Sequence, residues 1–421
     1  MNNINNFIDS AGKIKIWPSK HDLKFKVLEY LANKFEYNRF YSEKEVNNII
    51  ESYHTFSDYF LLRRGLIESK LLSRTRNGAK YWRPDANVNE EKIMISKLIE
   101  ENYSVGSVIN IIKIKSGVGS ICYHILTDKG EFILKNIENN GMNNPYNESK
   151  LHEILASENI PVSKFYSTNY DQYVFNQDNN IYHLQSFIKG EIYKPNTSPH
   201  WLMNESSIML GKIQKVMDKI PKLPTGMGEE YFRYMSPEKS ILSYLETLKI
   251  AEANNDVNII EDIKYRISIL NAIQKMDIEM GRLTCKNTHG DYSINQIICG
   301  RNSINAVIDF TSACVHPICW EVIRSYSIAD SECANGNINI ENLKIYAAKF
   351  LEYGELNSYD LKIMPYVYFY QLLFPNYYSQ YYLSNNSNKQ ILLDNASFST
   401  KLCKWLDFNI DSLSDELVKA F

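Results

Sequence analysis

The sequence predicts an α+β protein in which a small β-rich lobe precedes a large helical lobe, with a short separate unit in front of both. Three observations support this. Residues 107–190 contain short apolar runs of strand length, interrupted by one helical stretch. Residues 191–421 are dominated by helical stripes. Residues 1–85 carry their own helical stripes and a hairpin pattern, and a polar linker with a helix over 86–106 follows them.

The bulk composition limits the function classes. A length of 421 residues favours two or three domains, and a net charge of -3 argues against nucleic-acid or membrane binding by the whole chain. No apolar run reaches the roughly 18 residues of a membrane span, and Met1–Asn6 lacks the regions of a signal peptide. The seven cysteines are scattered, without a C-x-x-C pair. We therefore expect free thiols and a cytoplasmic location.

Residues 1–85 have the pattern of a small domain of three helices and a hairpin. Ser42 is the expected N-cap of the second helix, where Glu45 completes a capping box. The expected elements are a helix over 22–36, a helix that opens at Ser42, a helix over 60–67, and short strands at 71–74 and 79–83 around a turn at Asn77-Gly78.

This unit resembles the uncharacterised winged-helix-like domain found beside some bacterial transcriptional regulators. Residues 1–90 hold 15 Lys plus Arg and 11 Asp plus Glu, a charge of about +4 that leaves about -7 for the remainder. Winged helices often bind DNA through their third helix, here the one with Arg63 and Arg64. Because +4 is small beside typical basic binders, a docking or gating module is favoured, and DNA is the less favoured partner.

The β-rich lobe and the helical lobe follow in order along the chain. Strands are expected at 109–115, 121–126, 132–137, 173–176 and 182–187, with a helix over 148–158 between the third and the fourth. After residue 198, stripes such as Ile241, Tyr244, Leu245 and Leu248 indicate packed helices.

Two acids and an amide carry the strongest chemical signal. Asp291 stands behind a His-Gly pair, amides follow four and five residues later, and Asp309 closes the apolar run Ala306–Ile308. Phosphoryl transfer from ATP needs one carboxylate near the acceptor hydroxyl, and a second carboxylate with an amide oxygen to hold Mg²⁺.

This segment resembles the catalytic segment of the aminoglycoside phosphotransferase and choline kinase-like family, small-molecule relatives of protein kinases. The resemblance implies a bilobed protein-kinase-like fold. It also implies that Asp291 contacts the acceptor hydroxyl, that His289 braces the loop through backbone hydrogen bonds, and that Asp309 bridges Mg²⁺ to the phosphates. The family usually places Asn five residues past the first acid. Here Gln296 occupies that position and Asn295 stands one residue earlier, so Gln296 is favoured over Asn295 as the metal-binding amide.

The nucleotide site implied by the resemblance lies in the β-rich lobe. Lys135 is expected to contact the phosphates, with Glu148 as its partner and Glu153 as the alternative. The remaining nucleotide-binding candidates are Ser116, Gly117, Gly119 and Ser120 in a phosphate-covering loop, and Gln185, Phe187 and Ile188 at the hinge that pairs with the purine. A lone G-x-G is weak evidence by itself, and the side chains of the hinge do not distinguish ATP from GTP.

The sequence thus predicts a phosphotransferase that uses ATP (or GTP) and Mg²⁺ to phosphorylate a small-molecule hydroxyl. An aminoglycoside-type antibiotic is the named acceptor, which would make the protein an antibiotic-resistance enzyme. A metabolite kinase of the sugar, choline or homoserine type is the alternative, and a DNA-binding regulator that uses the kinase fold as a ligand sensor is a third hypothesis. Glu321 and Arg324 are candidates for the acceptor site, although support of the catalytic loop is the favoured role there.

Overall fold

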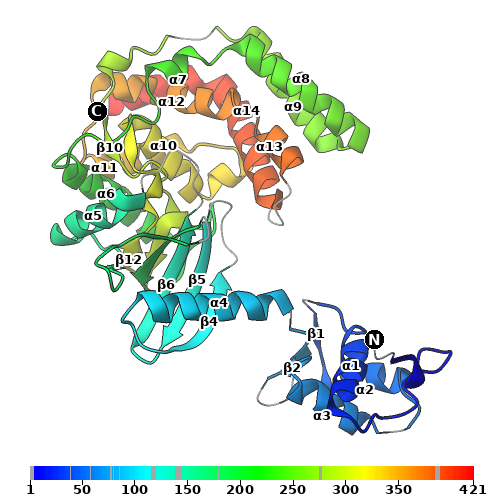
Figure 1. Cartoon of the computed structure of the whole chain (residues 1–421). Coiled ribbons are helices and arrows are strands. Elements are labelled where there is room, and N and C mark those ends of the chain that lie inside the picture. The colour runs from blue at the N-terminus through cyan, green and yellow to red at the C-terminus, as the bar shows by residue number, and fades with distance from the viewer. Residues whose placement is uncertain are drawn as a thin grey trace. The chain divides into compact units, whose positions relative to one another are not determined.

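The computed structural model consists of two compact units, Met1–Glu101 and Asn102–Phe421. Figure 1 presents the chain from blue at its N-terminus to red at its C-terminus. The residues that the structure describes are 4–37, 39–56, 58–75, 78, 80–84, 86–114, 120–137, 145–177, 180–274, 277–384 and 389–421.

The first unit combines helices with a small antiparallel sheet of order β1-β3-β2. The predicted capping box is confirmed, because the Ser42 hydroxyl accepts from the Glu45 N–H and the Glu45 carboxylate accepts from the Ser42 N–H. β1, only two residues long, carries no sequence signal. The turn at Asn77 lies outside the described residues. The elements are η1 (Ile4–Asn6), α1 (His21–Ala32), β1 (Phe40–Tyr41), α2 (Glu43–Ser52), α3 (Tyr59–Glu68), β2 (Ser73–Arg74), β3 (Tyr81–Trp82) and α4 (Ala86–Asn102).

The second unit begins with an antiparallel sheet of order β4-β5-β6-β9-β7, with β8 paired to β9. All five predicted strands are present, and β7 is an additional two-residue strand. β6 is central and carries Lys135 opposite Cys122 of β5 and His183 of β9. The elements are β4 (Val108–Ile114), β5 (Ser120–Thr127), β6 (Gly130–Ile137), α5 (Pro145–Ser157), β7 (Phe165–Tyr166), β8 (Phe175–Gln177) and β9 (Asn180–Ser186).

The rest of the second unit is mainly helical, with two short hairpins that carry the sequence motif. β10 pairs with β13, and β11 pairs with β12. The α+β fold class predicted from the sequence is confirmed. The elements are α6 (His200–Met217), α7 (Glu229–Arg233), α8 (Pro237–Asn254), α9 (Val257–Ala272), η2 (Met280–Arg282), β10 (Cys285–Thr288), η3 (Ile294–Gln296), β11 (Ile297–Cys299), β12 (Ile304–Val307), η4 (Phe310–Ser312), β13 (Cys314–Pro317), α10 (Ile318–Ala329), η5 (Glu332–Asn335), α11 (Ile340–Phe350), α12 (Ser358–Leu373), α13 (Tyr377–Leu383) and α14 (Lys389–Ala420).

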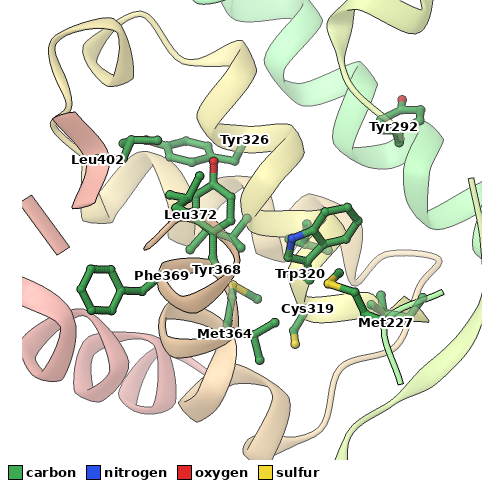
Figure 2. Packing of buried hydrophobic residues seen from close by; sticks show 14 of the residues in the cluster. Met227, Tyr292, Cys319, Trp320, Tyr326, Met364, Tyr368, Phe369, Leu372 and Leu402 are labelled. Atoms are coloured by element: carbon green, nitrogen blue, oxygen red, sulfur yellow. The ribbon is translucent and has the colours of Figure 1, made fainter. Parts of the chain in front are cut away.

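The helical core is built around α12, which packs against both α10 and α14. Figure 2 shows Tyr326 of α10, Tyr368 of α12 and Leu402 of α14 within this core, and all three are buried. Trp320 of α10 belongs to the same cluster. The core therefore fixes the position of α10, the helix that follows the predicted catalytic segment.

A buried arginine joins α9 to the rest of the helical core. Arg266 is fully buried, and its guanidinium donates to the Tyr244 hydroxyl at 2.9 Å, the Thr400 hydroxyl at 2.7 Å, the Ser399 hydroxyl at 2.5 Å and the Leu372 carbonyl at 2.7 Å. A buried charge without such donor contacts would be costly. Arg266 thus connects α9 to α8, α12 and α14 through hydrogen bonds.

Replacing Arg266 with Met should lower the free energy of unfolding by roughly 2–4 kcal/mol, because it leaves buried hydroxyl and carbonyl groups without their donors. The control is Lys264→Met, which removes an exposed cation from the same helix. Urea unfolding of both variants measures the difference. Equal urea midpoints for the two variants would contradict this role of Arg266.

Candidate active site

Lys135 and Asp309 form the first part of the site. The Lys135 ammonium lies 2.5 Å from Asp309 Oδ1, and only 8% of the Lys135 side chain is exposed. Burial disfavours the ammonium, but the carboxylates of Glu148 and Asp309 outweigh it and raise the pKa of Lys135. Burial likewise disfavours the Asp309 carboxylate, yet the Lys135 ammonium prevails and lowers its pKa to about 2. Both groups are therefore charged at neutral pH.

Asp309 is held by the backbone as well as by its partners. It follows β12 with φ +65°, in the left-handed region, and its Oδ1 also accepts from the Thr311 hydroxyl at 2.6 Å. A side chain in this region costs energy that the surrounding structure must supply. The left-handed turn ends the strand and presents the carboxylate to Lys135.

Glu148, the predicted partner of Lys135, is buried and forms no ion pair with it. The ion pair of Lys135 is with Asp309, whereas both Glu148 oxygens are without a hydrogen-bond partner in the described part of the chain. His183 Nδ1 and His152 Nε2 lie 3.7 Å and 3.8 Å from these oxygens. Burial raises the pKa of Glu148 to about 7, against the lowering effect of Lys135. Lys135 and Glu148 thus interact electrostatically without direct contact.

Glu153, the alternative partner, accepts from the Tyr173 hydroxyl at 2.7 Å. This contact is exposed at the surface of the lobe, and Lys135 is buried. The structure thus keeps Glu148, and not Glu153, within the electrostatic reach of Lys135.

The loop after β10 carries the predicted base. His289 Nε2 donates to the Ile308 carbonyl at 3.0 Å, while its Nδ1 accepts from the Asp291 N–H at 3.3 Å. These two contacts fit a neutral imidazole with its proton on Nε2. Burial also lowers the pKa of His289. His289 therefore ties the loop to the residue that precedes Asp309.

Gly290 is required between His289 and Asp291. Its φ is +80°, and a Cβ atom at this position would lie 2.0 Å from the Ser312 carbonyl oxygen. Only glycine fits such a close backbone approach. The distance between Asp291 and Asp309 therefore depends on Gly290.

Both oxygens of Asp291 are engaged. Oδ1 lies 2.5 Å from Arg324 Nη2, and Oδ2 accepts from Gln296 Nε2 at 3.0 Å. The side chain of Asp291 remains 40% exposed, in contrast to the buried Glu321. An incoming hydroxyl group can therefore reach Asp291 from solvent.

Glu321 supports the loop through hydrogen bonds. Its carboxylate accepts from the Thr288 hydroxyl and from the Tyr292 N–H at 3.1 Å. Burial raises the pKa of Glu321 to about 7, and the Tyr292 N–H opposes this shift. These contacts fit the loop-supporting role favoured for this position.

The two candidate metal-binding amides differ in position. Gln296 faces Asp291, and its backbone carbonyl accepts from the Ile308 N–H at 2.9 Å, beside Asp309. Asn295 is exposed. The described residues contain no group of three or more His, Cys, Asp or Glu side chains that could hold a metal ion. Mg²⁺ commonly takes one or two protein oxygens and completes its shell with phosphates and water, which a carboxylate at Asp309 and an amide at Gln296 fit.

Replacing Gln296 with Ala should weaken Mg²⁺-dependent nucleotide binding by about tenfold or more, on the scale of a lost ligand or supporting contact. Asn295→Ala is the matched control and should change it by less than about twofold, as expected of an exposed side chain. Titration of a fluorescent nucleotide at several Mg²⁺ concentrations measures both. A larger loss for Asn295→Ala would reverse the assignment.

The hinge candidates differ in orientation. The Gln185 side chain is buried and accepts from the Ser163 hydroxyl at 2.6 Å. The Phe187 ring stacks on His124 with 4.2 Å between centroids, and its N–H donates to the Glu131 carbonyl. In the described parts of the chain, no hydrogen bond uses the backbone of Ile188, so Ile188 has both groups free for a purine edge.

The phosphate-covering loop is the part of the predicted site about which the structure says least. Ser116, Gly117 and Gly119 lie outside the described residues. Ser120 is the first residue of β5, opposite Ile137 of β6. The prediction for this loop therefore stays a prediction.

Arg324 was a candidate for the acceptor site, but its contact with Asp291 was not predicted from the sequence. Thr311 is a second group that the sequence reasoning missed, because a hydroxyl two residues past an acid is an ordinary pattern. His152 and His183 beside Glu148 gave no sequence signal either, because they come from different elements.

The chain has a two-lobed fold, a lysine–aspartate pair that joins the lobes, and a His-Gly-Asp loop near this pair. This combination is typical of kinase-like phosphotransferases. The family model described as "Phosphotransferase enzyme family" matches residues 110–340, more than half of the chain. The protein belongs to this family and is a phosphotransferase.

Solved structures are similar to this chain at low sequence identity. The microcompartment-associated aminopropanol kinase has a TM-score of 0.50 at 10% identity, over 76% of this chain and 98% of that one. An aminoglycoside phosphotransferase from Alicyclobacillus acidocaldarius has 0.49 at 10%, over 76% and 96%. A spectinomycin phosphotransferase solved with ADP and spectinomycin has 0.46 at 13%, over 78% and 98%. No curated protein matches this chain.

The N-terminal unit matches a second family model over residues 13–83, described as "Uncharacterized protein conserved in bacteria". The two arginines of this unit that were proposed for DNA contact form ion pairs within the unit. Arg63 forms a 2.8 Å ion pair with Glu43, and Arg64 forms a 2.7 Å ion pair with Glu68. The winged-helix assignment stays a prediction. No helix among the described residues has the length and apolar character needed to cross a membrane.

Proposed function

We propose that the protein transfers the γ-phosphoryl group of ATP to a hydroxyl group of a small molecule, with Mg²⁺ as cofactor. The observation that carries this proposal is the joint placement of Lys135, Asp309, Gln296 and Asp291 in one connected set of contacts. The family membership supports it. Relatives of this fold include a kinase named for aminopropanol and a phosphotransferase solved with ADP and spectinomycin.

The residues divide the chemistry among them. Lys135 would contact phosphate oxygens of the nucleotide in place of Asp309. Asp309 and Gln296 would hold Mg²⁺, which would supply positive charge to neutralise the phosphates. Asp291 orients the acceptor hydroxyl and accepts its proton late in the transfer, when the alcohol oxygen has bonded to phosphorus. The products are ADP and the phosphorylated alcohol.

Two acceptor classes follow from the family, an aminoglycoside-type antibiotic and a small metabolite alcohol of the sugar, choline or homoserine type. A DNA-binding role for residues 1–85 gains no support from the ion pairs of Arg63 and Arg64. The nucleotide is proposed as ATP, with GTP as the comparison in the test.

The test is a panel of aminoglycosides, sugars, amino alcohols and hydroxy acids, scored for ADP release with Mg²⁺ and ATP, and repeated with GTP. At least one acceptor should raise ADP release above the rate without acceptor, and removal of Mg²⁺ with a chelator should abolish the increase. Failure to bind either nucleotide in the presence of Mg²⁺ would overturn the proposal.

A further inference from the structure

The Asp291 carboxylate faces two different sides of the site. On one side, Oδ2 contacts Gln296, whose carbonyl is bonded to the Ile308 N–H. The next residue is Asp309, which pairs with Lys135. These groups mark the nucleotide side. The opposite oxygen, Oδ1, therefore marks the side from which the acceptor approaches.

Arg324 occupies that acceptor side. It rises from α10, donates to Asp291 Oδ1 at 2.5 Å and to the Tyr292 carbonyl at 3.2 Å, and keeps 20% of its side chain exposed. Its guanidinium lies 5.4 Å from the centre of the Trp320 ring, a cation–π arrangement. The exposed part of the guanidinium therefore presents a permanent positive charge beside Asp291, and the buried Trp320 ring holds it in place.

Apart from Arg324, the described groups that contact the Trp320 ring are uncharged. Its indole N–H donates to the Gln371 amide oxygen at 3.4 Å, and the Gln371 amide nitrogen donates to the Tyr377 hydroxyl at 2.5 Å. The His316 ring lies 4.9 Å from the Trp320 ring. Burial, aided by the positive charge of Arg324, lowers the pKa of His316 to about 4, so this ring is neutral at pH 7.

We propose that Arg324 recognises the acceptor, and that the acceptor carries a carboxylate or phosphate group close to the hydroxyl that is phosphorylated. This inference rests on the proposed kinase function. A hydroxyl group that donates to Asp291 Oδ1 shares this oxygen with the guanidinium, whose remaining N–H groups can bind a second anionic partner. Guanidinium groups bind carboxylates and phosphates through two parallel hydrogen bonds. A polycationic aminoglycoside would place like charges side by side.

Matched acceptor pairs of equal length and opposite charge test the inference. We would compare 3-hydroxypropionate with 3-amino-1-propanol, and 4-hydroxybutyrate with 4-amino-1-butanol. Glycerol 3-phosphate beside glycerol separates a phosphate from a carboxylate preference, and kanamycin represents the polycations. ADP release with Mg²⁺ and ATP gives kcat and KM for each acceptor.

We expect kcat/KM for an anionic acceptor to exceed that of its cationic partner by about tenfold or more, as for a charge-selective contact. Arg324→Gln should remove this preference mainly by raising KM for the anionic acceptor. Arg324→Lys should retain part of it, which also covers the case in which the glutamine variant misfolds. Arg282→Gln, which removes a half-exposed cation paired with Glu279, is the matched control.

Three results would overturn the inference. They are a preference for the cationic partner, an equal loss for both members of a pair in Arg324→Gln, and a lack of response to every anionic acceptor while ATP is still bound and hydrolysed with Mg²⁺. Absence of ATP binding and hydrolysis would instead overturn the kinase function, and the inference would fall with it.

Discussion

Asp291→Ala should reduce turnover by about 10²–10⁴-fold, the usual contribution of a positioned proton acceptor. Nucleotide binding should stay close to that of the unchanged protein, because Asp291 touches Gln296 and Arg324 and does not contact Lys135 or Asp309. Steady-state ADP release on a confirmed acceptor measures the first effect, and titration of a fluorescent nucleotide measures the second.

Asp394→Ala is the control for this experiment, because it removes an exposed carboxylate whose contact is with the Gln390 amide. It should leave both quantities unchanged. A variant without Asp291 that keeps more than about a tenth of normal turnover would show that another group accepts the proton, since general-base effects are larger than that.

Lys135→Met should abolish measurable turnover and also make stability depend more steeply on pH. In the unchanged protein, the ammonium favours the ionised forms of both Asp309 and Glu148. In the variant, the ammonium no longer opposes burial, and the pKa of each carboxyl rises. The folded variant then binds more protons than its unfolded chain, so its free energy of unfolding falls as pH rises.

The stability deficit of Lys135→Met should therefore widen between about pH 5 and pH 8. Thermal unfolding at several pH values without nucleotide measures it. Lys135→Arg should restore the pH profile of the unchanged protein, and Lys129→Met, at an exposed turn position, is the surface control. A deficit that is constant with pH would mean that Lys135 does not balance these two acids.

Local patterns predicted the parts of the fold that depend on neighbouring residues. The capping box joins Ser42 to Glu45, three positions later in the chain, and it is confirmed. The long strands of the β-rich lobe follow from short apolar runs. The two-residue strands β2 and β3 were predicted from the turn residues Asn77-Gly78 between them, a signal that the equally short β1 and β7 lack.

The contacts that define the site were not predictable from spacing. Lys135 and Asp309 are separated by 174 residues, and Asp291 and Arg324 by 33, so no local pattern joins them. The resemblance led us to expect Glu148 as the partner of Lys135. In the structure Glu148 acts on Lys135 electrostatically, while the ammonium contacts Asp309 and the Glu148 carboxylate lies near His152 and His183.

The left-handed backbone of Asp309 limits how its chemistry can be dissected. Asn and Asp adopt this conformation several times more readily than other non-glycine residues, so Asp309→Asn changes the charge and leaves the turn intact. Ala or Glu at position 309 would add a conformational penalty of about 1–2 kcal/mol. Loss of activity in those two variants would mix altered backbone geometry with altered metal affinity. Among substitutions of the second acid, asparagine is therefore the informative one, and a library that samples position 309 evenly would overstate how strictly the reaction demands a carboxylate there.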